Sequence, residues 1–580
     1  MKTGTLNIQT GLALSAISLG AICGGSNAAQ LGVISWDNGE QIPEAIASIE
    51  ALSQHDLARF ILPSLPADQR AMIEDQGGFG SEHTHAGCAH FHASNTDLDG
   101  RVAPPADPID ITDPEFRAEM TQEQLAMLDE MQQSIDEGYR LPMLCFTPDV
   151  DPKFVEAVGE LFQRSMGNGN SRFQGTDRWN ITATDGGGIQ QGDNITLTYS
   201  FVADGTFIPN IGIGVGSGNS VLFSFLNGIY GGGPAQWQPI FDQVFDRWEE
   251  LIGVTYVYEP NDDGVNTNQN VGVLGVRGDV RIGAFNLAND GTNGGVLAYN
   301  NFPNDGDMIF DTDNFFNNTS GNSRRLRNVA AHEHGHGLGM LHVGPLSRTK
   351  LMEAIATTAF DGPQLDEILG GQRRYGDHYE PESNDPDNPP HLGALGVNGF
   401  AILENVSIDD NLDFDFYKFT LTSPGQVQIE VAPSAGAYAQ GPQGSSGSLT
   451  DYNAMHDLSI FLLEGNAPFS PIEFVNAEPA GQTESLLANV FTPGEYLIQI
   501  SGDSTNNIQR YLLTLFIGSV GQCSAADIAA PFGALNFFDI SAFITLFNSG
   551  DPAADIAAPF GSLNFFDISA YITLFNAGCP

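Results

Sequence analysis

The sequence predicts a multidomain protein in which an α/β (α+β) domain is followed by an antiparallel β-sandwich and a small α-helical module. A chain of 580 residues exceeds what one hydrophobic core usually supports. Strand-like and helix-like segments alternate within residues 169–376, whereas short strands of alternating polarity, separated by turn residues, fill most of residues 377–520. A 28-residue repeat within residues 521–580 closes the chain.

Residues 1–28 have the features of a secretory signal peptide. Lys2 precedes a mostly apolar run from Gly11 to Cys23, and small residues follow up to Ala28. Lipidation of Cys23 is a weaker alternative, because the bulky Ile22 precedes it. No later apolar run is long enough to span a bilayer. We therefore expect a secreted or cell-surface protein without a membrane span.

The charge balance excludes some classes of partner. The chain has 22 Lys+Arg against 71 Asp+Glu, a formal net charge of −49. Such a surface repels phosphate backbones and anionic lipids, which argues against nucleic acid and membrane partners. It suits a protein that binds metal cations.

Four segments predict the layout of the α/β domain. "NITLTYSFV" alternates in polarity as a strand does, and "QPIFDQVFDRWEELIG" has the apolar spacing of an amphipathic helix that ends at Gly253. "VTYVYEP" and "GDVRIGAF" then read as further strands. These elements precede a segment in which histidines cluster.

That segment, "AHEHGHGLGMLHV", predicts a metal site. His332 and His336 are four residues apart, so a helix places both imidazoles on one face. Glu333 lies beside them and can take a proton from a metal-activated water. Gly339 can adopt the positive φ that ends a helix, which lets the chain double back and bring His342 to the same ion.

Three nitrogen ligands with one open position are the arrangement of a catalytic zinc site. The alternative, a solvated histidine-rich helix or an adventitious metal patch, does not account for the full H-E-x-x-H-x-x-G-x-x-H spacing. On the same helix His334 points away from the ion, and we expect it to face solvent.

The histidine segment resembles the zinc signature of the metzincins, and its surroundings from Arg178 to Gly376 resemble the matrixin branch. "NDGTNGGVLAYNNFPNDGDMIFDTDNFF" is similar to the edge strand and calcium-loop region of that family, and "TKLMEA" to its Met-turn. The resemblance implies a metzincin-like catalytic domain over residues 169–376. It also implies hydrolysis of protein or peptide substrates by a zinc-activated water, which attacks a carbonyl polarised by the metal.

Carried over residue by residue, the resemblance implies that the histidines bind zinc and that Glu333 is the general base. It also implies that Met352 lies beneath the ligands and that the substrate pairs with the strand Val296–Tyr299. The ligand set is His332, His336 and His342. The chain departs from the family in three places, one of which is Val343, where matrixins have a small polar residue after the third histidine. Tyr299 stands where matrixins have a histidine ligand of a second, structural zinc. Asp311 and Asp313 are retained as candidates for calcium, but Asn314 replaces an acid.

Residues 29–168 precede the catalytic pattern and end at the Gly- and Asn-rich "SMGNGNSRF", so we expect an inhibitory propeptide. A thiolate can replace the water on zinc. Cys88, which lies among histidines, is the first candidate for such a cysteine switch and Cys145 the second. A disulfide between these two cysteines is the alternative.

Residues 377–520 resemble the pre-peptidase C-terminal domains of secreted bacterial proteases, in "EPESND", "DFDFYKFTL" and "PGEYLIQISG". The resemblance implies a β-sandwich with an auxiliary role. An ordinary spacer and a substrate-binding module are equally compatible with it, and we assign no chemistry to it.

The repeat resembles a dockerin-like module ending in Gly-Cys. Asp527 and Asp539 in one copy, and Asp555 and Asp567 in the other, are candidates for calcium, although Ala and Pro occupy inner positions of a standard loop. Two helical hairpins without metal are the alternative. We expect a Cys523–Cys579 disulfide and contacts between the Phe537–Phe538 and Phe565–Phe566 pairs to hold the module together. It would dock to a cell-surface or extracellular partner.

Two classes of function are compatible with these features. The first is a secreted zinc endopeptidase, and the second is a non-catalytic metal-binding protein of the extracellular matrix or cell surface. Glu333 discriminates between them, because a site that only binds metal has no use for a base beside the ion. The sequence therefore favours the enzyme.

Overall fold

The protein forms two compact units in the computed structural model. The unit that contains the histidine segment, called here the histidine unit, comprises Ala93–Glu380 and Gly436–Tyr452. The sandwich unit comprises Met1–His92, Pro381–Ala435 and Asn453–Pro580. The structure describes residues 12–14, 34–36, 109–166, 178–268, 271–287, 295–312, 314–379, 384–490, 492–519, 524–529, 535–558 and 560–578.

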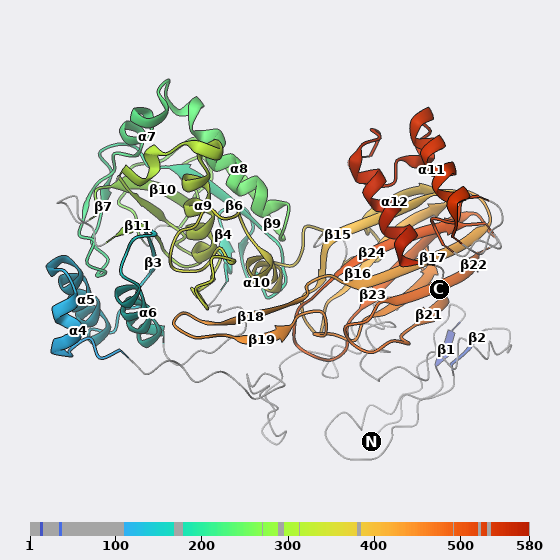
Figure 1. The fold of residues 1–580 in the computed structure, drawn as a ribbon, viewed down its shortest axis with the longest axis horizontal. Helices are drawn as coiled ribbons and strands as arrows, with labels where there is room; N and C mark the ends of the chain where they lie inside the picture. The colour runs from blue at the N-terminus through green and yellow to red at the C-terminus, as the bar shows by residue number, and fades with distance from the viewer. Residues whose placement is uncertain are drawn as a thin grey trace, which may run out of the picture. The chain divides into compact units, whose positions relative to one another are not determined.

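A six-stranded mixed sheet forms the centre of the histidine unit (Figure 1). Its strand order is β3-β11-β12-β10-β6-β9. The run from β12 through β10 and β6 to β9 is parallel, whereas β11 is antiparallel to both β12 and β3. The strands are β3 (Met143–Phe146), β6 (Ile195–Phe201), β9 (Val254–Tyr258), β10 (Val280–Phe285), β11 (Val296–Asn300) and β12 (Met308–Asp311). The predicted strands of the α/β domain are thus confirmed.

Helices cover this sheet. The central helix α9 packs against β3, β11 and β12, and α8 packs against α9. Seven α-helices are described in this unit: α4 (Pro114–Glu119), α5 (Gln122–Asp136), α6 (Pro152–Met166), α7 (Leu222–Tyr230), α8 (Gln238–Glu249), α9 (Ser320–Gly337) and α10 (Leu365–Tyr375). Helix α8 ends before the predicted Gly253, because the chain tightens at Leu251, whose N–H bonds the Trp248 carbonyl over 3.0 Å.

The shorter elements of the unit connect these layers. Within residues 178–379 the structure describes two 3₁₀ turns and five short strands: η3 (Pro234–Gln236), η4 (Asn314–Asn317), β4 (Ile181–Thr182), β5 (Gly186–Gly187), β7 (Phe207–Ile208), β8 (Gly218–Asn219) and β13 (Val343–Gly344). The last of these follows His342 directly, so it lies beside the metal-site segment.

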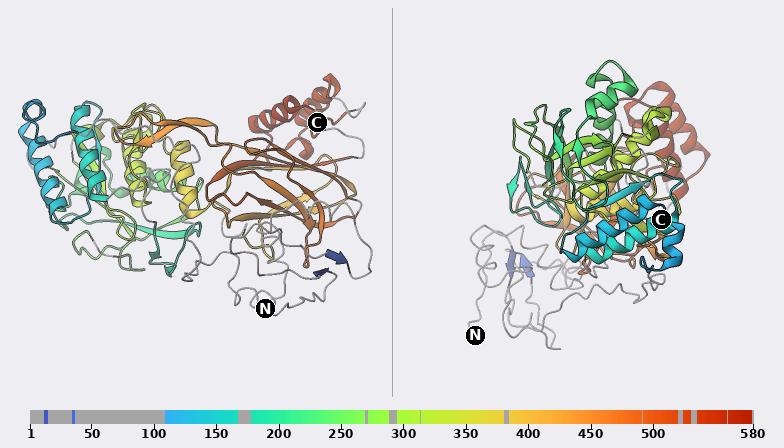
Figure 2. Two further views of the ribbon diagram at one scale, coloured as in Figure 1. Left: turned by 90° about the horizontal axis from the view of Figure 1, so that it is seen from below. Right: turned by 90° about the vertical axis from the view of Figure 1, so that its left-hand side faces the viewer.

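The segment predicted to be a propeptide contributes to the core of the histidine unit. Its helices α5 and α6 pack side by side (Figure 2), and β3 joins the sheet. Leu128, Phe154 and Leu161 are fully buried in one cluster that also includes residues of β11 and β12. The junction at residues 167–177, the signal peptide apart from 12–14, and Cys88 lie outside the described residues.

A hairpin from the C-terminal half of the chain completes the histidine unit. It consists of β18 (Ala437–Pro442) and β19 (Ser448–Asp451), which lie in the sequence between two strands of the sandwich. Strand β18 pairs antiparallel with β13. The polarity pattern predicted one domain over residues 377–520, whereas this hairpin folds with the histidine unit.

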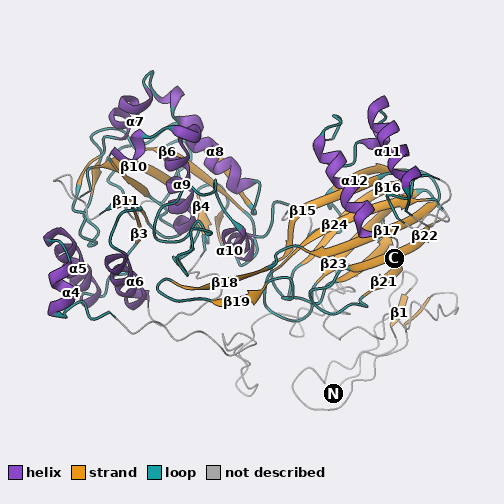
Figure 3. Cartoon of the chain, viewed as in Figure 1, coloured by secondary structure: helices purple, strands orange, loops and turns teal. Residues whose placement is uncertain are grey.

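The sandwich unit has a five-stranded sheet, β14-β16-β23-β20-β21, and a four-stranded sheet, β15-β24-β17-β22 (Figure 3). The pairing is antiparallel except between β14 and β16. The Tyr417 and Tyr511 hydroxyls join the two sheets over 3.0 Å. The strands are β14 (His391–Leu395), β15 (Phe400–Ile408), β16 (Phe414–Leu421), β17 (Gly425–Pro433), β20 (Ser459–Glu464), β21 (Pro471–Val475), β22 (Glu484–Val490), β23 (Gly494–Ser501) and β24 (Gln509–Gly518). A further short pair is β1 (Leu12–Leu14) and β2 (Ile34–Trp36).

The C-terminal repeat forms helices α11 (Phe537–Ser549) and α12 (Phe565–Ala577), with a short turn η5 (Pro552–Ala554) between them. The rings of Phe543 and Tyr571 stack with centroids 4.0 Å apart and hold the two copies together. The expectation that the Phe537–Phe538 and Phe565–Phe566 pairs do this was wrong. These rings are between 60% and 74% exposed, because they lie at the first turn of each helix, away from its buried face. Cys523 and Cys579 lie outside the described residues.

Both repeat aspartates at the helix starts have structural roles. Asp539 and Asp567 are the third residues of capping boxes, and their carboxylates accept backbone N–H groups of Asn536 and Asn564. Among the described residues, no group of three or more potential metal ligands gathers in the repeat. Calcium binding by Asp527, Asp539, Asp555 and Asp567 stays a prediction. No described helix has the length and apolar character needed to cross a membrane.

Candidate metal centre

Helix α9 presents two of the three histidines, as the spacing predicts. Its apolar residues Leu326, Val329 and Ala330 are buried against the sheet and fix the rotation of the helix. A methyl group at Gly335 would stand 2.4 Å from the Sδ atom of Met352. The glycine that weakens the helix therefore makes room for the Met-turn.

Gly339 reverses the chain after α9. Its φ of 94° lies in the left-handed region that glycine adopts without strain. The Met340 N–H bonds the Gly335 carbonyl over 2.9 Å, which closes the turn and returns the chain towards the helix. As a result His342 faces the two helical histidines.

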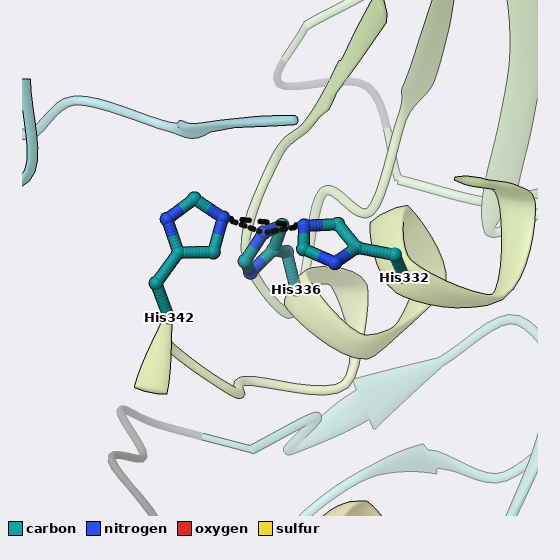
Figure 4. A group of neighbouring side chains, drawn as sticks. All are labelled: His332, His336 and His342. Carbon is teal, nitrogen blue, oxygen red and sulfur yellow. Dashed lines mark hydrogen bonds between the residues drawn. The ribbon is translucent and has the colours of Figure 1, made fainter. Parts of the chain in front are cut away.

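The three imidazoles converge through their Nε2 atoms (Figure 4). The distance is 3.1 Å between His332 and His336, and 3.2 Å from His342 to each of them. All three side chains are buried. The predicted ligand set is thus brought together by the fold.

Each ring directs its other nitrogen at an oxygen. The Nδ1 contacts are Leu351 O at 2.7 Å from His332, Met340 O at 2.8 Å from His336, and Gln443 Oε1 at 2.9 Å from His342. An amide or peptide oxygen only accepts, so each Nδ1 carries the proton and donates. The three Nε2 atoms are then unprotonated, and their lone pairs face one another.

This arrangement fits zinc. Converging lone pairs repel unless a cation lies among them, and a tetrahedral zinc with bonds of about 2.0–2.1 Å separates its nitrogen ligands by about 3.3 Å. Burial lowers the pKa of His332 to about 4, and burial together with the neighbouring rings lowers the pKa of His336 and His342 well below the usual value. Neutral imidazoles are the form that binds metal.

Glu333 lies next to this set of histidines. Its side chain is fully buried, and neither carboxylate oxygen has a hydrogen bond within the described structure. Burial raises the pKa of Glu333 well above its ordinary value. An unpartnered buried carboxylate is costly, which indicates a functional rather than a structural role.

Cys145 on β3 also reaches this centre. Its Sγ atom, a ring nitrogen of His332 and a carboxylate oxygen of Glu333 lie within 4.8 Å of one another. Within the described structure Cys145 is a free, buried thiol. Burial, and then the negative charge of Glu333, raise the pKa of this thiol well above its usual range.

Strand β3 occupies the edge at which substrate pairing was expected. It runs antiparallel to β11, with Leu144 opposite Tyr299 and Cys145 opposite Ala298. On its other side Phe146 exchanges two backbone hydrogen bonds of 2.9 Å with residues 354 and 356. The predicted edge strand is therefore an inner strand of the sheet, because the chain's own N-terminal segment covers it.

The Met-turn beneath the histidines is held by two buried carboxylates. Met352 is buried, and its N–H donates to Glu367 on α10 over 2.9 Å. Glu353 accepts backbone N–H groups of four preceding residues, Ser347, Arg348, Thr349 and Lys350. Neither glutamate was predicted from the sequence, although an acid directly after the turn methionine is visible in "TKLMEA".

His334 does not face solvent, contrary to the expectation. It is fully buried, and its Nε2 contacts the Tyr256 hydroxyl over 2.6 Å. Its ring meets Phe245 of α8 edge-on. The expectation failed because α8 covers the face of α9 opposite the metal centre, so that the helix is buried on both sides.

Of the predicted calcium ligands, Asp311 lies at the end of β12 and Asp313 lies outside the described residues. One Asp311 oxygen accepts the Leu287 N–H over 2.8 Å. Within the described chain, Asp311 belongs to no group of potential metal ligands. Calcium binding here stays a prediction.

Comparison with known proteins bears on this site. Residues 232–367 match the sequence model of the Matrixin family, Peptidase_M10, and these residues include α9, the three histidines and the Met-turn. The match supports a metalloprotease, and that family implies zinc. No curated protein matches the chain.

Two solved structures resemble parts of the chain. The pre-peptidase C-terminal domain of a collagenase from Bacillus anthracis is 16% identical, with 22% of this chain and 98% of that chain covered and a TM-score of 0.14. PliG of Aeromonas hydrophila, a periplasmic inhibitor of g-type lysozyme, is 14% identical, with 22% of this chain and 96% of that chain covered and a TM-score of 0.15.

Proposed function

We propose that the protein is a zinc-dependent endopeptidase in which Glu333 acts as general base. The observation that carries the proposal is the triangle of unprotonated Nε2 atoms beside a buried carboxylate with no hydrogen bond in the described structure. A site that only stores or binds metal has no use for that carboxylate. The alternative, a non-catalytic metal-binding extracellular protein, leaves Glu333 without a role.

The residues divide the chemistry between them. Zinc, held by the Nε2 atoms of His332, His336 and His342, would supply a Lewis acid that polarises the peptide carbonyl and activates water. Glu333 accepts the proton of the attacking water and delivers it to the nitrogen of the leaving amine. The peptide would pair with β11 in the place of β3.

Removal of zinc tests this proposal. The full chain is freed of its N-terminal segment by limited proteolysis followed by mild denaturant. It is then assayed on unstructured peptides before and after chelation and after zinc is restored. We expect internal cleavage that is lost on chelation and regained with one equivalent of zinc. Zinc-loaded protein that cleaves no peptide would support the non-catalytic alternative instead.

We also propose that the chain is made in a latent form. Strand β3 lies along β11, and Cys145 lies beside His332 and Glu333, so this segment both fills the substrate position and brings a thiol to the centre. Cys145 is therefore a better candidate for the switch than Cys88, which the sequence placed first. Binding of the Cys145 sulfur to zinc would favour the thiolate and so offset the effect of burial on the pKa of this thiol.

Two cysteine variants of the full chain test the latency. Cys145→Ser removes the thiol and should raise peptide cleavage by the uncleaved chain, whereas Cys88→Ser, the matched control, should leave it low. Equal activity of the two variants would show that latency does not require the Cys145 thiol and rests on β3 in the substrate position alone.

We propose further that the protein is secreted and that the C-terminal repeat docks it to an extracellular partner. The support is the signal-like N-terminus together with four exposed rings at equivalent places of the two repeats: Phe537, Phe538, Phe565 and Phe566. Replacement of all four by Ser should release the protein from cells without changing peptide cleavage. Unchanged cell association would contradict a docking role.

A further inference from the structure

The third histidine is held differently from the other two. His332 and His336 donate to main-chain carbonyls of Leu351 and Met340, which belong to the turns around the site. His342 instead donates to the side chain of Gln443, which is 101 residues further along the chain. Its orientation therefore depends on a distant segment.

The orientation of the Gln443 amide is determined by a second contact. Its Nε2 donates to the Val155 carbonyl of α6 over 2.7 Å, so its Oε1 is the atom that faces His342. An acceptor at that place keeps the proton on Nδ1 and leaves Nε2 free for metal. Gln443 is more than nine-tenths buried, which limits competition by water.

The hairpin that carries Gln443 is built against the histidine unit. Val343 and Gly344, directly after the third ligand, pair with β18. Tyr438 and Gln440 both donate to Asp366 of α10, over 2.7 and 2.6 Å. The hairpin thus holds both the backbone that follows His342 and the ring of His342.

Close packing at the hairpin depends on glycine. A methyl group at Gly344 would stand 2.6 Å from the Pro442 carbonyl oxygen, and one at Gly447 would stand 2.8 Å from Pro345. Gly447 also has a left-handed φ of 69°. These glycines allow the hairpin to approach closely enough for the Gln443 amide to reach the imidazole.

We propose that Gln443 is a positioning residue of the metal centre, so that a hairpin encoded within the C-terminal sandwich sets the affinity for zinc. This inference rests on the proposed function only in its choice of metal. Residues that orient a ligating histidine typically change metal affinity 10- to 100-fold when they are removed. A fragment that ends before residue 436 would lack this support.

The test uses the full chain and measures zinc binding rather than cleavage. Zinc affinity is measured by competition with a chromophoric chelator for the wild type and for Gln443→Leu, Gln443→Glu and Gln426→Leu. We expect about 10- to 100-fold weaker binding for Gln443→Leu. Gln443→Glu keeps an acceptor for the His342 N–H and should bind more tightly than the leucine variant. The control Gln426→Leu makes the same change on β17 and should match the wild type.

Thermal unfolding without metal separates positioning from folding. The zinc-free melting temperature of Gln443→Leu should stay near that of the wild type, while the upward shift on adding zinc becomes smaller. The inference is overturned if Gln443→Leu binds zinc as tightly as the wild type, or if its zinc-free form loses as much stability as its zinc-loaded form. A wild type that binds no zinc would overturn the proposed function as well, whereas zinc binding without peptide cleavage would overturn the proposed function alone.

Discussion

Gly335 shows how a single residue links the helix to the turn beneath it. Its missing side chain gives Met352 a place under the ligands, and the sulfur would stand 2.4 Å from an added methyl group. A helical glycine normally costs up to about 1 kcal/mol relative to alanine. At this position the close approach of Met352 outweighs that cost.

Gly335→Ala should therefore destabilise the protein, in spite of its higher helix propensity. We expect a loss of about 1–3 kcal/mol in the free energy of unfolding, because the buried Met352 must move. Gly228→Ala on α7 is the matched control, since a methyl group there meets nothing within 4 Å. It should be neutral or stabilising by up to about 1 kcal/mol. Equal effects of the two changes in chemical denaturation would contradict the packing argument.

At the scale of elements, α10 and the Met-turn are coupled through Glu367. Its carboxylate accepts the Met352 N–H and, at the start of α10, the Gln364 N–H, each over 2.9 Å. Burial, and then the charge of Asp366, raise the pKa of Glu367 to about 7. The folded protein therefore holds this proton at pH values where the unfolded chain releases it.

The sign of the pH effect follows from that difference. Between about pH 4.5 and 7 the folded state binds more protons at Glu367 than the unfolded state, so stability from this group falls as pH rises. Below about pH 4.5 both states are protonated and the contribution is constant. Wild type should lose stability more steeply across this window than Glu367→Gln. The free energy of unfolding of both proteins is measured by chemical denaturation at several pH values. The prediction is contradicted if it falls equally steeply with pH in both.

The burial of the N-terminal elements α5, β3 and α6 in the core determines how we expect activation to proceed. Leu128, Phe154 and Leu161 are fully buried with residues of the sheet, so α5, β3 and α6 should stay bound after the chain is cut within residues 167–177. A nicked chain should elute as one species in gel filtration and stay nearly inactive until mild denaturant releases the fragment. Immediate separation with full activity would show that these elements contribute little to the core.

At the scale of the whole molecule, the sequence predicts features that depend on local spacing but not contacts between distant residues. His332, His336, Glu333 and the Gly339 turn were predictable, because helix periodicity and glycine conformation are local properties. The contact of Gln443 with His342 was not, since no local pattern joins residues 101 apart. The burial of His334 likewise depends on α8, which the pattern of α9 alone does not reveal.

The same distinction applies to the domains. The strands of the sandwich and the helices of the repeat followed from polarity patterns, and the described structure contains them. The sequence did not predict that β3 pairs with β11 or that the β18–β19 hairpin folds with the histidine unit. Strand partners depend on tertiary packing, which a local polarity pattern does not contain. Both unforeseen elements lie at the metal centre.

The most direct test of the central claim compares wild type with Glu333→Gln after release of the N-terminal segment. The change keeps the size of the side chain and removes its ability to accept a proton. Zinc content, measured in the same samples, should stay at one ion per chain in both proteins, because the three histidines are unchanged. We predict that kcat/KM for peptide cleavage falls by about 10²- to 10⁴-fold. A Glu333→Gln protein that is zinc-loaded and as active as the wild type would contradict the assignment of Glu333 as the general base.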